Sequence, residues 1–253
     1  MQIGLAGYGR MGALIHRAAL ERGHRVPIIV DPHSDAPEVT DREFACLQSP
    51  PDVIIDFTSP RAAVENIARY GELKVPAVIG TTGWYDRMEQ VAAIVEKSGI
   101  GLIWAGNFSL GVNLFYRVVE SAAAMMNRFP QYDPFVHESH HRRKVDSPSG
   151  TAKMIAGILI DKLDRKETVV GELPQRRLRD EELQVSSSRG GALPGRHRVV
   201  FDSDVDSITL EHNARNRSGF AEGALLAAEW IRGRSGLYGI GDLMNSIIGG
   251  VKD

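Results

Sequence analysis

Gln2-Ile-Gly-Leu-Ala-Gly-Tyr-Gly-Arg-Met-Gly12 is the stretch that decides the fold of the first half of the chain. Its first part, Gln2–Ala6, is short and apolar, as in a buried strand. After the glycines, apolar residues recur at helical spacing up to about Gly23; they are Met11, Leu14, Ile15, Ala18 and Ala19. A strand that runs through G-x-G-x-x-G into a helix is typical of a dinucleotide-binding βαβ unit.

Each glycine has its own physical role in such a unit. Gly7 permits the tight turn, Gly9 lets the backbone approach a pyrophosphate, and Gly12 lets the helix pack closely on the strand. Together with the residues that open the helix, they form the expected pyrophosphate-binding set: Gly7, Gly9, Arg10, Met11 and Gly12.

An acidic residue ends the next predicted strand, Val26–Val30. Asp31 is placed to accept hydrogen bonds from the adenosine ribose, which favours NAD over NADP because a 2′-phosphate would be repelled there. The residues 32–34 offer no Arg or Lys to hold that phosphate. Arg10 is the remaining candidate for it, so use of both nucleotides stays open.

The alternation of strands and helices continues to about residue 111. Apolar runs predict further buried strands at Val53–Phe57, Val75–Ile79 and Gly101–Trp104, with helices that begin near Pro60 and span about 86–97. This order predicts a Rossmann-type, doubly wound parallel sheet, whose ligand-binding loops follow the carboxyl ends of the strands. Thr81, Thr82 and Asn107 lie in such loops, where turn chemistry and ligand contact are equally good interpretations.

From about residue 112 the pattern changes. A helix from Val112 to about Arg128 is followed by segments that look antiparallel, including a hairpin of 198–202 with 207–212. These segments predict an α+β domain with an open mixed sheet over residues 112–216, whose edges favour self-association. Helices at Phe220–Ile231 and near 242–248 are expected to return to the first domain. That domain is therefore expected to comprise residues 1–111 and 217–253. The charged segment 164–182 is predicted to be exposed, without an assigned function.

A basic run between residues 137 and 151 is the candidate site of the second domain. It holds His140, His141 and Lys144, and it ends at Ser149, which can cap a helix over about 151–164. Because a helix N-terminus presents unpaired N–H groups, it binds a carboxylate or phosphate well. A solvated basic loop is the alternative for such a run alone, but the capped helix favours an anion site with an acid built in.

Composition limits the other functions. A net charge of −2 gives no global attraction to nucleic acid or to anionic membranes. The single Cys46 cannot form an intrachain disulfide, and neither a leader nor an apolar run near 18 residues is evident, so a cytoplasmic location is expected. The His cluster lacks Cys partners and helical ligand spacing, so no metal is expected.

One motif is specific enough to indicate a family. Residues 138–152 read E-x-H-H-x-x-K-x-D-x-P-S-G-T-A, which resembles the hallmark of 4-hydroxy-tetrahydrodipicolinate (dihydrodipicolinate) reductases of the diaminopimelate route to lysine. Supporting matches run along nearly the whole chain: Gly-Arg-Met-Gly at 9–12, Asp-Phe-Thr at 56–58, Gly-Thr-Thr-Gly at 80–83, Asn-Phe-Ser-x-Gly-Val-Asn at 107–113, His212, Arg217, Phe220, Ala221 and Gly223.

The resemblance implies NADH- or NADPH-dependent reduction of a cyclic dicarboxylate by a homo-oligomer, expected to be a tetramer. It places His140 and Lys144 at the positions of proton donation, without separating the two. It assigns the substrate carboxylates to His141 and the turn Ser149, Gly150 and Thr151, and puts Arg217 at the side of the site. The residues expected to flank the nicotinamide are Gly80, Thr82, Asn107 and Phe108, and Phe57 and Thr81 are expected to bind the cofactor as well.

Two departures from the family pattern concern the cofactor side. The glycine loop is one residue shorter than the commonest form, and position 106 is Gly, so nucleotide preference is open. Two other functions remain possible from the residues alone. One is a nucleotide-sensing regulator that holds a partner or RNA with its basic loop; the other is a different two-domain dehydrogenase for an amino or hydroxy acid.

Overall fold

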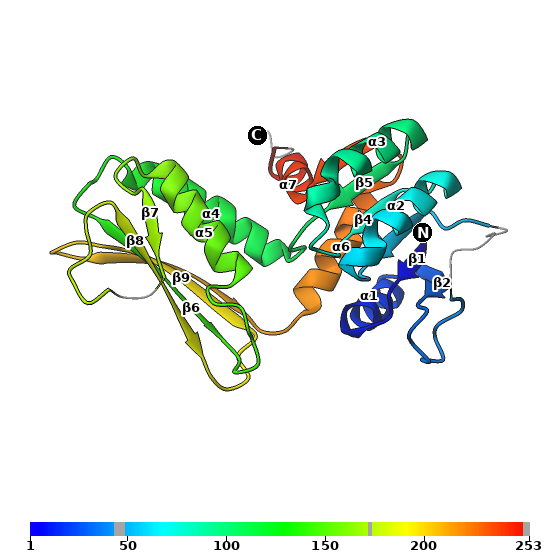
Figure 1. Ribbon diagram of the computed structural model, residues 1–253, viewed down its shortest axis with the longest axis horizontal. Helices are drawn as coiled ribbons and strands as arrows, with labels where there is room; N and C mark the ends of the chain where they lie inside the picture. Colours follow the sequence, from blue (N-terminus) through cyan, green and yellow to red (C-terminus); the bar gives the residue numbers. More distant parts are fainter. Residues whose placement is uncertain (43–48, 172–173, 250–253) are drawn as a thin grey trace. The chain divides into compact units, whose positions relative to one another are not determined.

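The computed structural model describes residues 1–42, 49–171 and 174–249. Cys46, and with it the expectation about disulfides, lies outside these ranges. The chain divides into two compact units, one of Met1–Leu110 with the chain from Ser218 onward, and one of Gly111–Arg217 (Figure 1).

The first unit is built on a six-stranded sheet in the order β11-β5-β4-β3-β1-β2, with every neighbouring pair parallel. Its strands are β1 (Gln2–Ala6), β2 (Arg25–Val30), β3 (Val53–Asp56), β4 (Ala77–Ile79), β5 (Gly101–Trp104) and β11 (Gly236–Gly239). Its helices are α1 (Arg10–Glu21), α2 (Pro60–Leu73), η1 (Tyr85–Arg87), α3 (Met88–Ser98), α6 (Ser218–Ile231) and α7 (Ile240–Gly249).

Helices cover both faces of this sheet, as the apolar strands require. Ile3, Leu5 and Ile55 point toward a core shared with α1, α6 and α7. The alternate residues Ile54 and Ile79 point toward α2 and α3. The predicted Rossmann-type sheet is thus confirmed. The strand β11, which follows α6, was not predicted from the sequence.

The second unit holds a five-stranded mixed sheet in the order β10-β9-β6-β8-β7. Its strands are β6 (Asp133–His140), β7 (Thr168–Val170), β8 (Glu182–Arg189), β9 (Gly195–Asp202) and β10 (Ser207–Ala214), with helices α4 (Leu110–Met126) and α5 (Gly150–Lys162). Both helices pack on one face, where Val136, Val185 and Phe201 are buried (Figure 1). The opposite face is more polar and includes His137, Ser186 and Arg198.

The predicted open mixed sheet is confirmed: β9 pairs antiparallel with β6 and β10, whereas β8 pairs in parallel with both β6 and β7. The chain passes through the helix α5 between β6 and β8, as a parallel pair requires. One expectation needs correction, because the segment 164–182 is not a wholly exposed excursion. It contains β7, and Lys166 and Glu182 are buried because Lys166 donates to backbone carbonyls and Glu182 pairs with Arg176 and Arg179.

Within the described ranges, no helix combines the length and the apolar character needed to cross a membrane.

Candidate active site

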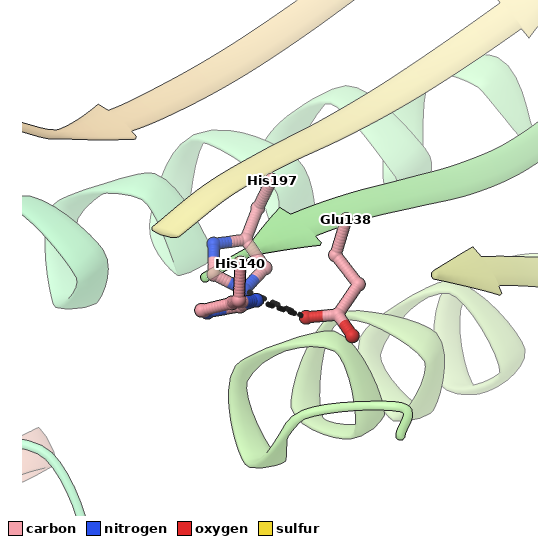
Figure 2. Close-up of side chains that lie close together, drawn as sticks. All are labelled: Glu138, His140 and His197. Atoms are coloured by element: carbon pink, nitrogen blue, oxygen red, sulfur yellow. Dashed lines mark ion pairs between the residues drawn. The ribbon is translucent and has the colours of Figure 1, made fainter. Parts of the chain in front are cut away.

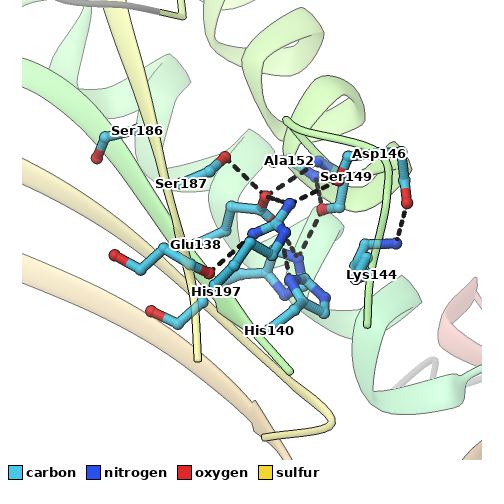
Figure 3. A network of polar contacts seen from close by, with 12 residues as sticks. Glu138, His140, Lys144, Asp146, Ser149, Ala152, Ser186, Ser187 and His197 are labelled. Atoms are coloured by element: carbon cyan, nitrogen blue, oxygen red, sulfur yellow. Dashed lines mark hydrogen bonds and ion pairs between the residues drawn. The ribbon is translucent and has the colours of Figure 1, made fainter. Parts of the chain in front are cut away.

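The register of the second sheet gathers polar side chains on its helix-covered face. Glu138 of β6 lies opposite Ser187 of β8 and His197 of β9, and His140 lies opposite Arg189. Alternate residues of a strand share a face, so Glu138 and His140 point the same way as these neighbours. Figure 3 shows the resulting cluster beneath the start of α5.

Glu138 is the buried centre of this cluster. Its Oε1 accepts hydrogen bonds from the backbone N–H of Ser149 at 3.1 Å, the Ser187 hydroxyl at 2.7 Å and the Arg189 guanidinium at 2.6 Å. Burial alone would raise the pKa of Glu138, but the hydrogen bonds from Ser149, Arg189 and Ser187 lower that pKa to about 2. Glu138 is therefore a carboxylate at neutral pH.

Two histidines face the other oxygen of Glu138. Oε2 lies 2.9 Å from Nδ1 of His140 and 3.6 Å from Nε2 of His197 (Figure 2). The His140 contact is short, but its angle is not that of an aligned hydrogen bond. Burial lowers the pKa of His140, and the positive charges of Lys144 and Arg189 lower it further. Glu138 raises this pKa, but by less than the other groups lower it. Burial also lowers the pKa of His197 to about 4, so both rings are neutral near pH 7.

The loop from residue 141 to 149 carries the other predicted acid, Lys144. Its Nζ lies 2.8 Å from Oδ1 of Asp146 (Figure 3). The loop is held at both ends: the N–H of His141 donates to the carbonyl of Leu193, and Arg189 donates to the carbonyl of Asp146. The backbone thus fixes the segment that places His140, His141 and Lys144 within one short turn.

The N-terminus of α5 begins where this loop ends. The Ser149 hydroxyl caps the helix by accepting from the N–H of Ala152 at 3.2 Å, as the sequence predicted, and it lies 3.2 Å from Nε2 of His197. Gly150 and Thr151 form the first turn of the helix. Unpaired N–H groups at such a turn suit a carboxylate ligand.

Unused hydrogen-bonding capacity is concentrated in this cluster. In the described part of the chain, eight buried side-chain atoms lack an aligned hydrogen-bond partner. Five of them belong to the cluster; they are in Glu138, His140, His141, Arg189 and His197. Buried polar groups are seldom left unpaired without a functional reason, so this cluster is the best candidate for a polar ligand site in the second unit.

A metal ion is a less suitable occupant than an anion. Within the described ranges, Glu138, His140 and His197 form the set of three potential ligands whose donor atoms lie within 4.8 Å of one another. The Arg189 guanidinium already lies 2.6 Å from the same carboxylate, and Lys144 lies near enough to lower the pKa of His140. A dication would be repelled by both side chains, so the expectation of no metal stays a prediction that this charge distribution supports.

In the first unit, the glycine loop has the shape that a dinucleotide needs. Gly7 has φ +86°, and a Cβ there would lie 2.5 Å from the carbonyl oxygen of Phe57. A Cβ at Gly12 would overlap with the carbonyl of Gly7, whereas one at Gly9 would meet nothing within 4 Å. Gly9 is exposed at the N-cap of α1, with Arg10 exposed beside it and Met11 packed toward the core. This open helix N-terminus fits a pyrophosphate.

Asp31 ends β2 beside this loop. Its Oδ2 accepts from the N–H of Tyr8 at 2.7 Å and its Oδ1 from the N–H of His33 at 2.8 Å. Arg42, a residue that the sequence analysis missed, folds back and donates to the carbonyls of Asp31, Pro32 and Ser34. A cationic side chain therefore does lie beside residues 32–34, although its position in the sequence gave no sign of it.

A buried carboxylate organises the loops that follow β3 and β4. Asp56 accepts hydrogen bonds from Thr58, Asn66, Tyr70 and Thr81, with distances of 2.7 to 3.0 Å. Thr81 is therefore buried and tied to the loop, whereas Thr82 is exposed. The motif Asp-Phe-Thr at 56–58 includes Asp56, but the sequence gave no sign of this role.

The remaining predicted cofactor residues lie at the same ends of the strands. The ring of Phe57 packs on Gly80, where a Cβ would overlap with it, and lies 6.3 Å from the ring of Phe108. The Asn107 side chain accepts from the N–H of Ser109 at 2.8 Å and opens α4. These contacts fix the loops that follow β3, β4 and β5 at the carboxyl edge of the sheet.

Not every predicted residue joins a cluster. Arg217 is exposed in the segment between β10 and α6, and no interaction found among the described residues links it to Glu138. Conversely, Arg189, His197 and Asp146 belong to the cluster although the sequence analysis did not select them. Side chains alternate between the two faces along β6, which places Glu138 and His140 on the same face. This alternation gave no information about the strands that pair with β6.

Comparison with known proteins identifies the family. The model for dihydrodipicolinate reductase, N-terminus, matches residues 1–108, and that for dihydrodipicolinate reductase, C-terminus, matches residues 111–244. The chain belongs to the dihydrodipicolinate reductase family. The resemblance inferred from the motif at 138–152 is confirmed.

Relatives in this family align along most of the chain. A 4-hydroxy-tetrahydrodipicolinate reductase from Christiangramia forsetii is 34% identical over 248 residues, which are 98% of this chain and 99% of the relative. One from Methanoregula boonei is 38% identical over 195 residues, 77% of this chain and 75% of the relative. The solved structure of a dipicolinate-bound dihydrodipicolinate reductase from Paenisporosarcina sp. TG-14 has a TM-score of 0.77 at 25% identity, covering 96% of this chain and 99% of that one.

Proposed function

We propose that this protein is a 4-hydroxy-tetrahydrodipicolinate reductase of the diaminopimelate route to lysine, which forms tetrahydrodipicolinate with NADH or NADPH. Family membership over both units and relatives of that name support this activity. The observation in the structure that supports it best is the Glu138 cluster, with its unpaired polar atoms beside a capped helix N-terminus. The binding of dipicolinate, a ring dicarboxylate, to the Paenisporosarcina relative agrees with such a site.

The second unit is proposed to hold the two carboxylates of the substrate. The first turn of α5, with Ser149, Gly150 and Thr151, offers N–H donors, and His141 offers a buried Nδ1 that lacks a partner in the described part of the chain. Arg217 is retained as a further partner for a carboxylate. Two anionic groups on one ring require such paired donors and cations, because each would otherwise lose its hydration without compensation.

Lys144 is the proposed proton donor. The sequence left His140 and Lys144 as equal candidates, but burial lowers the pKa of His140, which makes its ring neutral near pH 7. A neutral imidazole is a poor source of a proton compared with an ammonium group in the same loop. Asp146, 2.8 Å from Nζ, holds Lys144 in place.

The first unit is proposed to bind the nucleotide. Gly7, Gly9, Arg10, Met11 and Gly12 would hold the pyrophosphate. The loops with Phe57, Gly80, Thr81, Thr82, Asn107 and Phe108 would line the nicotinamide. When bound, the reduced nicotinamide supplies the hydride; the protein residues orient it and keep water away.

Both nucleotides are proposed to bind, with Asp31 favouring NADH. The carboxylate of Asp31 suits the ribose hydroxyls. Arg10 would offer positive charge to a 2′-phosphate, as would Arg42 by leaving its ion pair with Asp35.

We also propose that the protein works as a homotetramer in the cytoplasm. Apolar side chains of α4 are left exposed in the single chain, among them Leu114, Val118 and Met125, which are 48%, 51% and 60% exposed. A second copy of the chain would cover such side chains. Native mass spectrometry tests the oligomer size directly.

The decisive experiment for the activity measures kcat/KM with each nucleotide, using freshly made product of dihydrodipicolinate synthase. The expected result is substrate-dependent oxidation of both NADH and NADPH. If neither is oxidised with this substrate, while an amino or hydroxy acid from a panel is turned over, the chain is a different dehydrogenase. Tight RNA binding with a steep salt dependence and no turnover would favour the regulator instead.

A further inference from the structure

The two oxygens of Glu138 have different environments. Oε1 is surrounded by donors only: the N–H of Ser149, the hydroxyl of Ser187 and the guanidinium of Arg189. Oε2 is buried without an aligned partner and faces Nδ1 of His140 at 2.9 Å (Figure 2). Nδ1 of His140 is itself buried and lacks any other hydrogen-bond partner in the described part of the chain.

The charge of Glu138 decides which ring nitrogen of His140 carries the proton. Its pKa of about 2 leaves Glu138 ionised, so Oε2 can only accept a hydrogen bond. A bare Nδ1 would set a lone pair against a buried carboxylate. A protonated Nδ1 can instead donate to Oε2 once the ring turns to align the N–H with it. Because burial also keeps the ring neutral, a proton on Nδ1 leaves Nε2 bare.

The surroundings hold the ring in this orientation. His197 packs edge-on against His140, with ring centroids 5.1 Å apart. Burial holds the pKa of His197 at about 4, so no second imidazolium competes for Glu138 at neutral pH. Gly195 lies on β9 with His197, and a Cβ there would come within 2.9 Å of Nε2 of His140, so the glycine leaves room beside this nitrogen.

We propose that Glu138 is a positioning residue that fixes His140 as its Nδ1–H tautomer, so that Nε2 acts as a hydrogen-bond acceptor. His140 then cannot donate a proton from Nε2, and Lys144 is the remaining acid of the loop. The tautomer is independent of the reaction, whereas its effect on turnover rests on the proposed reductase function. Carboxylate partners orient histidines in this way in many sites, and their loss costs about 10–100-fold in activity where this has been measured at metal sites.

The substitution Glu138→Gln tests the proposal because the amide has only one possible orientation. Its oxygen must take the place of Oε1, where all three neighbours donate. Its NH₂ group then takes the place of Oε2 and donates to Nδ1 of His140, which moves the ring proton to Nε2.

The tautomer is read from the ¹⁵N chemical shifts of the two ring nitrogens in protein labelled at histidine, with the His140 signals assigned through His140→Gln. The wild type is expected to show protonated Nδ1 and bare Nε2, and Glu138→Gln the reverse. The variant is expected to lose about 10–100-fold in kcat, with the Kd for NADH unchanged.

Glu182→Gln is the matched control. Glu182 is also buried in the second unit, paired with Arg176 and Arg179, and has a pKa lowered to about 2 by Arg176. Its substitution removes a comparable ion pair but should leave the His140 shifts and kcat as in the wild type.

A protonated Nε2 in the wild type would overturn the proposal, and that measurement needs no folded variant. Unchanged His140 shifts in a folded Glu138→Gln protein would overturn it as well. If the wild type does not turn over the substrate, the proposed function fails, while the ¹⁵N shifts still decide the tautomer.

Discussion

The ammonium group of Lys144 lies 2.8 Å from Oδ1 of Asp146, two residues further along the same loop. This ion pair fixes a flexible side chain next to the buried Glu138 cluster without burying its charge completely, since the Lys144 side chain remains 23% exposed. A cation held in this way can serve both to bind an anionic ring and to donate a proton to it.

Replacing Lys144 by Ala should therefore stop the reaction without affecting the nucleotide site. We expect kcat to fall by about 2–4 orders of magnitude, the usual scale for loss of a general acid. The Kd for NADH, measured by fluorescence titration, should not change. Lys153→Ala, an exposed lysine on α5, is the control and should keep full activity. Near-normal turnover by Lys144→Ala would show that the proton comes from elsewhere.

The glycine loop allows a pair of substitutions to separate folding from nucleotide binding. Gly9→Ala places a methyl group in open space, so stability should be unchanged while the Kd for NADH rises by about tenfold, or ~1.4 kcal/mol. Gly12→Ala forces a methyl group onto the carbonyl of Gly7 and should lower Tm as well. Thermal unfolding and NADH titration distinguish the two effects. Equal NADH affinity of Gly9→Ala and wild type would argue against a pyrophosphate at this loop.

Arg42→Ala should change nucleotide selectivity. Removing a cation beside Asp31 is expected to raise the Kd for NADPH by about tenfold, and that for NADH much less, because NADH lacks the 2′-phosphate. Arg69→Ala, an arginine of α2 paired with Glu72, serves as the control. An equal loss of affinity for NADH and NADPH would mean that Arg42 only supports the loop.

Asp56→Asn should destabilise the first unit. An amide must direct its NH₂ either toward the hydroxyl and backbone donors of Thr58 and Thr81 or toward the Asn66 amide, so at least one buried donor loses its acceptor. The expected cost is about 1–3 kcal/mol, seen as a Tm lower by several degrees. Asp86→Asn, at an exposed position, should leave Tm unchanged. A Tm equal to that of the wild type would contradict the role given to Asp56.

The lowered pKa values predict loss of stability in acid in two ranges. His197 takes up a proton near pH 6.5 in the unfolded chain, but burial lowers its pKa to about 4 in the folded protein. The unfolded chain therefore binds more protons between these two pH values, and the free energy of unfolding falls as the pH drops through this range. Glu138 and Glu182 add a second loss between about pH 4.5 and 2, because their native pKa values of about 2 lie below those of the unfolded chain.

His197→Gln should remove part of the first loss, as Tm measured between pH 7 and 4 would show. His140 and His212, whose pKa values are also lowered by burial, account for the remainder. A pH profile of Tm identical to that of the wild type would contradict a neutral, buried His197.

The predictions that held from sequence depended on short-range patterns. Apolar runs marked strands buried on both faces, such as the predicted Val53–Phe57, which is observed as Val53–Asp56. The glycines marked the first turn, and Ser149 capped α5 as expected. The motif at 138–152 also indicated the family. The prediction that 164–182 is exposed was wrong for Lys166 and Glu182. Both are buried with their charges paired, and hydropathy cannot reveal such partners.

By itself, the sequence determined the fold class, the family and the loop that carries Lys144, because each depends on residues close together in the chain. Only the tertiary structure decided which residues surround that loop. Glu138 meets Ser187, Arg189 and His197 through strand register, and Arg42 reaches the loop after Asp31 by folding back. Register and loop closure are set by the packing of whole elements, so no local pattern contains them.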